Sequence, residues 1–253
     1  MVSELSLKEK NDVLEPCAGE GAFISTLLSQ NIDINLTAYD INPDAVNILK
    51  SKFSEQVKIY QKDFILDNEI LLLTKSGGIF DRIIGNPPYG GWQDIKKRKA
   101  LKQIYKDLYV KETYALFMYI CINLLRPNGK LVFIIPDTFL SIHRHKQLRK
   151  EILTKTKILT IAKFPSSFFP DVNFGYSDLC IVTLERKEHI SQCMNNNVEI
   201  KFNFRSPEEM LDGGHHIITK IITQQTIYNS IDHALFISDD NSIINLINTS
   251  QKR

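Results

Sequence analysis

Short apolar segments alternate with longer amphipathic segments along the first three quarters of the chain. The short segments predict β-strands at residues 12–15, 34–39, 57–60, 80–84, 130–135, 158–163 and 178–184. The longer segments predict helices at residues 22–29, 43–53, 112–125 and 145–153. This alternation is typical of an α/β fold, here a mostly parallel seven-stranded sheet with helices on both faces.

Residues 190–253 do not continue this pattern, and within them only residues 198–204 predict a further strand. We therefore expect one main domain over residues 1–190 and a small C-terminal extension over residues 191–253. Ligands of parallel α/β sheets bind beyond the carboxyl ends of the strands. The residues that directly follow predicted strands are therefore the first candidates for a site.

Composition changes this picture mainly through the distribution of charge. The 253 residues carry a net charge of +2, which indicates no particular partner. However, residues 90–111 hold seven Lys or Arg against two acids, and residues 143–163 hold seven against one. Such segregation is typical of a surface that binds a polyanion, although solvated helix faces can carry the same pattern.

Targeting and metal-binding signals are absent from the sequence. The N-terminus is charged where a signal peptide would be apolar, and the longest apolar stretch, residues 114–122, is too short to span a bilayer. The four cysteines do not have the spacing of a disulfide framework or a zinc site. We expect a cytoplasmic protein without a metal site and without a membrane partner.

A glycine-containing turn follows the first strand. Gly19 and Gly21 permit a tight turn into a helix and the close approach of a ligand to the backbone. The third glycine of a dinucleotide-binding fingerprint is missing, so a pyrophosphate is not implied. Glu15 at the end of the strand suits a cationic ligand, whereas an ordinary strand-to-helix turn accounts for the same residues without a ligand.

Carboxylates follow the second and third strands. Asp40 can accept hydrogen bonds from both hydroxyls of a ribose, or it can serve the N-terminus of the next helix. Asp63 can accept from an exocyclic amine, and Phe64 can cover the face of a purine.

The most specific segment, Asn86-Pro87-Pro88-Tyr89, comes directly after the fourth strand. The two prolines fix the backbone and remove two N–H donors. The side-chain oxygen of Asn86 and the carbonyl of Pro87 can then both accept from one planar NH₂ group, while Tyr89 offers a stacking face. We expect this loop to bind an aromatic ring that carries an amino group.

Taken in this order, with the form Glu-Pro-x-x-Gly-x-Gly-x-Phe at residue 15, the four segments resemble the gamma class of N6-adenine DNA methyltransferases of restriction–modification systems. The resemblance covers roughly residues 10 to 186. It implies a Rossmann-like methyltransferase fold and a catalytic domain over residues 1–190. It also implies S-adenosylmethionine as cofactor and a flipped-out adenine of double-stranded DNA as substrate.

The resemblance assigns a role to each matched residue. The residues that it implies for cofactor binding are Glu15, Pro16, Cys17, Ala18, Gly19, Gly21, Asp40, Ile41, Asp63, Phe64, Asn86 and Pro88. The residues that it implies for the target adenine are Asn86, Pro87, Tyr89 and Phe169. With DNA as substrate, the residues expected to bind phosphates are Lys96, Lys97, Arg98, Lys99, Lys102 and Arg144. A DNA substrate also predicts a location at the prokaryotic nucleoid.

Two features depart from the family pattern. Family members carry a further cofactor-binding segment before the first glycine motif, and we expect it to be missing because 14 residues precede Glu15. Family members also carry a sizeable target-recognition domain, of which residues 191–253 offer at most the beginning. A separate target-recognition or endonuclease subunit is therefore a further expected partner.

Two alternatives stay open at this point. Protein-glutamine methyltransferases of release factors and some ribosomal RNA methyltransferases also use Asn-Pro-Pro-Tyr, although the release-factor enzymes carry a helical domain before the first motif. The other alternative is a non-catalytic DNA-binding subunit of a split enzyme. The intact Asp40, Asp63 and Asn86 favour an enzyme, because a subunit without cofactor has no need of them.

Overall fold

The computed structural model describes residues 1–90, 94–169 and 178–238. The last fifteen residues of the expected extension, 239–253, lie outside the described part. The strands are β1 (Asp12–Glu15), β2 (Asn35–Asp40), β3 (Val57–Gln61), β4 (Phe80–Gly85), β5 (Leu125–Pro136), β6 (Thr156–Phe164), β7 (Leu179–Arg186), β8 (Asn197–Phe202) and β9 (Ile218–Thr223). The helices are α1 (Ala22–Leu28), α2 (Pro43–Phe53), α3 (Asn68–Leu73), α4 (Ile95–Ile104), α5 (Thr113–Leu124), α6 (Lys146–Lys155), α7 (Ile190–Met194), α8 (Glu209–Asp212) and α9 (Gln224–Asn229).

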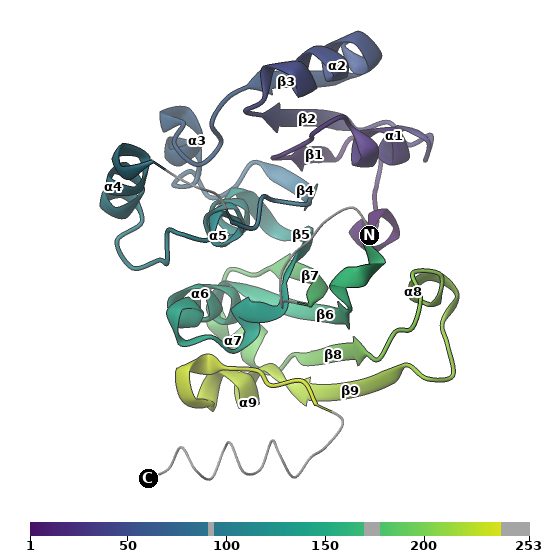
Figure 1. Ribbon diagram of the computed structural model, residues 1–253, viewed down its shortest axis with the longest axis vertical. Coiled ribbons are helices and arrows are strands. Elements are labelled where there is room, and N and C mark those ends of the chain that lie inside the picture. Colours follow the sequence, from purple (N-terminus) through teal and green to yellow (C-terminus); the bar gives the residue numbers. More distant parts are fainter. Residues whose placement is uncertain (91–93, 170–177, 239–253) are drawn as a thin grey trace.

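All strands of the described chain form one sheet in the order β3-β2-β1-β4-β5-β7-β6-β8-β9. Figure 1 shows them stacked along the long axis of the molecule, with β3 near one end and β9 near the other. The strands β1 to β5 pair in parallel, β7 runs antiparallel between β5 and β6, and β9 runs antiparallel to β8. The expected α/β class is confirmed, but the expected number of seven strands is wrong, because β8 and β9 extend the same sheet.

Helices cover both faces of the sheet, as expected. Along β1 and β4, alternate residues point to opposite faces. Leu14 and Ile83 belong to the larger core cluster, which contains α5 and α6, whereas Val13 and Ile84 belong to the cluster under α1 and α2. Helix α5 is almost entirely enclosed, with ten of its twelve residues buried, so it anchors the middle of the sheet.

The C-terminal strands are fixed to the sheet by Gln224, the first residue of α9. Its side chain is fully buried, and its Nε2 donates to the carbonyls of Leu153 at 2.8 Å and Thr156 at 2.7 Å. Its Oε1 accepts from the Ile158 N–H at 3.0 Å. The register between β6 and β7 shifts between Ile158 and Thr160, close to these hydrogen bonds. The Gln224 side chain therefore supplies hydrogen-bond partners to backbone groups near this irregularity.

Candidate functional site

The turn after β1 combines one enclosed glycine with one open glycine. Gly21 has a φ of 88°, and an added Cβ would lie 2.7 Å from the ring of Phe53, so only glycine fits there. Gly19 has a φ of 52°, and an added Cβ would meet no atom within 4 Å. The backbone at Gly19 therefore faces open space, where a ligand can come close to it.

Glu15 is a buried carboxylate at the end of β1. The residue is 2% exposed, and its Oε2 has no hydrogen-bond partner among the described residues. Burial and the nearby charge of Asp40 raise the pKa of Glu15 well above its usual value, against the opposing effect of the Ile24 N–H. A buried acceptor without a partner is costly, so this position is suited to a cationic ligand that completes it.

Asp40 ties the end of β2 to the same turn. Its Oδ2 accepts from the Gly19 N–H at 2.8 Å, and its Oδ1 accepts from the Asn42 N–H at 2.8 Å. Each carboxylate oxygen has a second lone pair, so these two bonds leave room for the hydroxyls of a ribose. The next residue, Ile41, is 57% exposed and presents an apolar side chain beside the carboxylate.

The acid after β3 has a partner that the sequence did not indicate. The Oδ2 of Asp63 lies 2.6 Å from the Nζ of Lys97 on α4, and both side chains are about one quarter exposed. Phe64 is only 3% exposed, with its ring stacked on Phe117 at 5.3 Å and edge-on to Tyr39 at 5.4 Å. Little of the Phe64 ring is therefore accessible for the predicted contact with a purine. A cofactor adenine would contact Phe64 only at the edge of its ring.

The Asn-Pro-Pro-Tyr loop leaves the sheet directly beside the β1 turn. An added Cβ at Gly85, the last residue of β4, would lie 3.4 Å from Pro16 and 3.5 Å from the Sγ of Cys17. The backbone N–H of Asn86 donates to the Cys17 thiol, whose burial raises its pKa well above the usual range. Cys17 is therefore protonated at neutral pH and serves as a small contact between the two loops.

The loop divides its four residues between the interior and the surface. Asn86 and Pro88 are exposed, Pro87 is buried, and Tyr89 is half-buried. Burial, with smaller effects of Cys180 and Cys17, raises the pKa of the Tyr89 hydroxyl, which stays protonated. The exposed amide of Asn86 is thus held on a fixed backbone and remains accessible to a substrate.

Two aromatic residues after β6 approach this loop. Phe168 and Tyr89 both pack against the small core cluster of Ile134, Phe164, Leu179 and Phe204. Phe169 is 37% exposed, with its ring 6.3 Å from that of Phe164. The structure therefore brings the predicted Phe169 to the edge of the sheet where Asn86 lies, and it adds Phe168 as a support that the sequence did not single out.

These positions fit the cofactor that the sequence implies. The β1 turn, Asp40 and Asp63 all lie at the carboxyl ends of adjacent parallel strands, with order β3-β2-β1-β4. They offer an open glycine backbone, an incompletely paired buried carboxylate and two further carboxylates with lone pairs to spare. S-adenosylmethionine has the matching groups, since its positive charges, its ribose hydroxyls and its adenine amine all need acceptors.

The basic run on α4 divides into two groups. Lys96, Lys99 and Lys102 are exposed, and their spacing of three places them along one face of the helix. Lys97 points instead to Asp63, and Arg98 is half-buried. We name the three exposed residues the α4 lysine face. The expectation that Lys97 binds DNA phosphate does not fit its ion pair, because the charge is already matched by a carboxylate.

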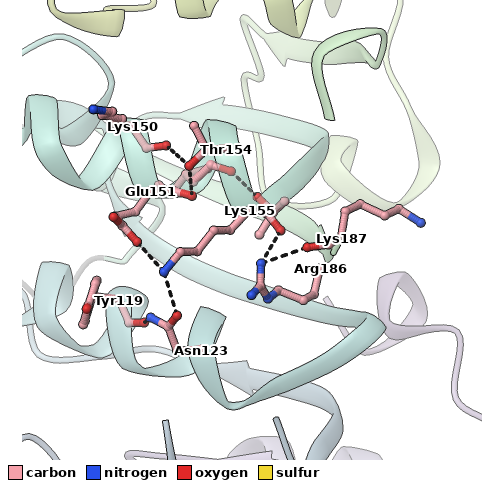
Figure 2. A network of polar contacts seen from close by, with 10 residues as sticks. Tyr119, Asn123, Lys150, Glu151, Thr154, Lys155, Arg186 and Lys187 are labelled. Carbon is pink, nitrogen blue, oxygen red and sulfur yellow. Dashed lines mark hydrogen bonds and ion pairs between the residues drawn. The ribbon is translucent and has the colours of Figure 1, made fainter. Parts of the chain in front are cut away.

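Part of the second basic segment is bound within the protein. Arg149 is 3% exposed and donates to the carbonyls of Phe139 at 2.7 Å and Ile142 at 2.9 Å, and burial lowers its pKa to about 10. Figure 2 shows Lys155 pointing to Glu151, 2.7 Å away, and to Asn123, 2.9 Å away. Arg149 and Lys155 therefore hold α6 in place.

Arg144 lies outside that network and is exposed. Its guanidinium donates to the Tyr109 hydroxyl at 2.9 Å and lies 5.1 Å from the centre of the ring. Such a contact orients the side chain, and the predicted role of Arg144 at DNA stays a prediction.

Metal-binding clusters and membrane-spanning helices are absent from residues 1–90, 94–169 and 178–238. Within these ranges, no cluster of three or more His, Cys, Asp or Glu is arranged to hold a metal ion. Within the same ranges, none of the helices has the length and apolar character that crossing a bilayer requires.

Comparison with known proteins gives related sequences and a related fold. The chain is 29% identical to the type II methyltransferase M.AccI of Acinetobacter calcoaceticus over 218 residues, which are 82% of this chain and 37% of that protein. It is 27% identical to M.HincII of Haemophilus influenzae over 241 residues, 90% of this chain and 43% of that one. The chain thus spans about two fifths of the length of these relatives.

Among solved structures, the type IIG restriction endonuclease BpuSI superposes with a TM-score of 0.66 at 15% identity, over 90% of this chain and 30% of that one. This likeness concerns the fold. The methylase relatives also support the S-adenosylmethionine cofactor that the sequence predicts. Residues 24–169, more than half of the chain, match the Eco57I restriction-modification methylase family. The resemblance found in the sequence is confirmed, and the chain belongs to this family of restriction–modification methylases.

Proposed function

We propose that the chain is the catalytic part of a site-specific DNA methyltransferase that transfers a methyl group to the N6 amino group of adenine. One observation carries this proposal. The exposed Asn86 sits on a proline-fixed loop, and the residue before it, Gly85 at the end of β4, lies directly against the cofactor turn at Pro16 and Cys17. A substrate amine held at Asn86 would therefore lie beside the cofactor site, as methyl transfer requires.

The target amine is a weak nucleophile, because its lone pair is conjugated with the purine ring. In the proposed site, the Oδ1 of Asn86 and the carbonyl of Pro87 accept its two N–H bonds. These acceptors favour a more pyramidal nitrogen and stabilise the positive charge that develops on it. Tyr89 stacks on one face of the base, and Phe169 covers it from the end of β6.

The cofactor supplies an electrophilic methyl group on a positively charged sulfur. Glu15 would pair with a cationic part of the cofactor, and Gly19 with Gly21 would let it approach the backbone. Asp40 would accept from its ribose, beside the apolar side chain of Ile41. Asp63 would accept a hydrogen bond from the amino group of the cofactor adenine. Its ion pair with Lys97 would be kept, because the carboxylate has further lone pairs.

An adenine inside a duplex cannot reach Asn86, so the base must be flipped out at a cost of a few kcal/mol. Stacking on Tyr89 and Phe169 returns about 1–3 kcal/mol per aromatic ring. The α4 lysine face, together with Arg144, would bind the phosphates around the extruded base. We propose residues 1–190 as the catalytic domain and residues 191–253 as the start of a target-recognition region. A separate recognition or endonuclease subunit would act with them at the prokaryotic nucleoid, in the cytoplasm.

Two measurements test this proposal. Titration calorimetry with S-adenosylmethionine separates an enzyme from a non-catalytic subunit, since the proposed site binds the cofactor and a subunit without it gives no heat. Incubation with a genomic DNA library, followed by modified-base sequencing, then reports the target atom and its sequence. Cofactor binding without any adenine modification, while a release-factor or ribosomal RNA substrate becomes methylated, would replace DNA as the substrate.

A further inference from the structure

Helix α4 has two sides of different character. Lys97, Leu101 and Tyr105 follow one another at intervals of four residues, so they lie along one side of the helix and of its C-terminal end. Leu101 is fully buried, and Tyr105 is 4% exposed. The residues of the α4 lysine face are all exposed. The helix therefore turns one side to the protein and a basic side to the solvent.

The side turned to the protein contacts the short segment that follows β3. The Nζ of Lys97 lies 2.6 Å from the Oδ2 of Asp63. The hydroxyl of Tyr105 donates to the carbonyl of Ile65 at 2.7 Å. Leu101 belongs to the same core cluster as Ile65. Helix α4 is thus attached, near both of its ends, to the segment that carries the proposed cofactor ligand Asp63.

The two ends of this attachment differ in kind. Tyr105 is buried and bonds to a backbone carbonyl, so the C-terminal end of α4 is fixed. Lys97 bonds to a side chain, and both partners are about one quarter exposed. An ion pair of this exposure contributes little by itself, because water competes for both charges. The first turn of α4 is therefore held by a contact that depends on the orientation of the Asp63 carboxylate.

A cofactor bound at Asp63 would strengthen this contact. Lys97 is paired with Oδ2, so Oδ1 can accept from the amino group of an adenine without displacing the lysine. An adenine on Oδ1 fixes the side-chain rotamer of Asp63, and Lys97 then loses less conformational freedom together with its partner when the ion pair forms. The same argument holds in reverse, since the ion pair orients Asp63 for the adenine. Each contact favours the other.

The first turn of α4 also carries part of the proposed DNA surface. Lys96 and Lys99 flank Lys97 in the sequence and are exposed. Asp94 begins the helix by accepting from the backbone N–H of Lys97 at 2.7 Å, and it comes five residues after Tyr89 of the target loop. A shift of this turn would therefore move charges that are proposed to bind phosphates close to the target base.

We propose that Lys97 is a positioning residue that couples cofactor binding at Asp63 to DNA binding by the α4 lysine face. This inference rests on the proposed function, because it takes Asp63 as a cofactor ligand and the α4 lysine face as a DNA contact. Bound cofactor orders Asp63 and Lys97, holds the first turn of α4 in place and raises the affinity for DNA. By linkage, DNA raises the affinity for the cofactor by the same factor.

Fluorescence anisotropy measures this coupling. The full chain is titrated into a labelled DNA duplex of mixed sequence that carries one mismatched adenine, since a mismatch lowers the cost of base flipping. Each titration is run with and without saturating S-adenosylhomocysteine, which has the same adenosine but no methyl group to transfer. We expect this compound to raise the DNA affinity of the wild type by about fivefold or more, and that of K97M by less than about twofold.

Two further variants separate the coupling from the charge of the helix. K97R keeps a cation beside Asp63 and is expected to restore the coupling. K96M is the matched control, because Lys96 is exposed on the α4 lysine face. K96M lowers the DNA affinity equally with and without S-adenosylhomocysteine and reduces the salt slope of binding by about 0.9, whereas K97M keeps the wild-type slope.

The possible failures separate the role of Lys97 from the proposed function. Equal coupling in K97M and the wild type, or a wild type without coupling, would overturn the role of Lys97 while the proposed function stands. A salt slope that falls in K97M as it does in K96M would place Lys97 at a phosphate and overturn the same role. A wild type that binds neither S-adenosylhomocysteine nor DNA would overturn both. Circular dichroism reports whether each variant is folded, and the wild-type comparison does not depend on any variant.

Discussion

Replacement of Glu15 by Gln separates the stability of the protein from its capacity to bind the cofactor. The wild-type carboxylate is 2% exposed, lies near Asp40 and has an Oε2 without a partner in the described chain. An amide of the same shape carries no charge. We therefore expect E15Q to be more stable than the wild type above neutral pH, and to bind S-adenosylmethionine more weakly.

The size of both effects follows from this environment. A buried charged acceptor without a partner costs about 1–3 kcal/mol, so E15Q gains up to roughly that amount in free energy of unfolding. The pKa of Glu15 is raised in the folded state, so folding favours the protonated form. Stability from this group is fully present below the unfolded pKa and is lost as the pH rises through the folded pKa. The advantage of E15Q therefore grows with pH.

The affinity for the cofactor should decrease in E15Q, whereas the stability of the protein increases. A hydrogen bond to a charged group contributes about 1.5–3 kcal/mol, so the affinity of E15Q for S-adenosylmethionine falls by roughly ten- to a hundredfold. Urea unfolding at several pH values measures the first effect, and calorimetry measures the second. Glu20→Gln is the control, because Glu20 lies on the same turn but is exposed. Lower stability of E15Q than of the wild type at high pH would show that the Glu15 charge is not a burden to the fold, and equal cofactor affinity would show that Glu15 does not bind the cofactor.

Three further predictions concern the Asn-Pro-Pro-Tyr loop, the proposed DNA contacts of the α4 lysine face, and the attachment of α9 to β6. Asn86→Ala lowers methyl transfer by about 10²–10³-fold, by analogy with the loss of an oxyanion donor, and leaves cofactor binding unchanged, as tritium transfer and calorimetry will report. Replacement of the three residues of the α4 lysine face by Ala reduces the salt slope of DNA binding by up to about 2.7, and a wild-type slope would exclude these residues from the phosphate contacts. Gln224→Ala lowers the free energy of unfolding in urea by about 3 kcal/mol, because it leaves buried backbone groups of β6 without partners, and a loss below about 1 kcal/mol would show that water replaces them.

The sequence predicted the first seven strands well because each contains a compact apolar run, and polar or turn-forming residues follow most of these runs. It did not place β9, since isoleucines fall on both of its faces and the period of two is hidden. The four site segments follow from the same logic, because strand ends in a parallel sheet meet at one edge.

The sequence was less informative about charges. Lys97 pairs with Asp63, 34 residues earlier in the chain, and Arg149 is buried against backbone carbonyls. A run of basic residues in a sequence shows how many positive charges are present. It does not show which of them form ion pairs or hydrogen bonds within the folded protein. Only the spacing of the α4 lysine face, three residues apart, could have indicated the exposed side of that helix.

In the proposed mechanism, Asn86 presents the amino group of an adenine to the methyl donor. Nucleoside mass spectrometry tests it most directly, after incubation of unmethylated genomic DNA with the full chain and isotopically labelled S-adenosylmethionine. We predict labelled N6-methyladenine with the wild type and a yield lower by about 10²–10³-fold with N86A. Labelled N4-methylcytosine in place of N6-methyladenine, or an equal yield with both proteins, would contradict it.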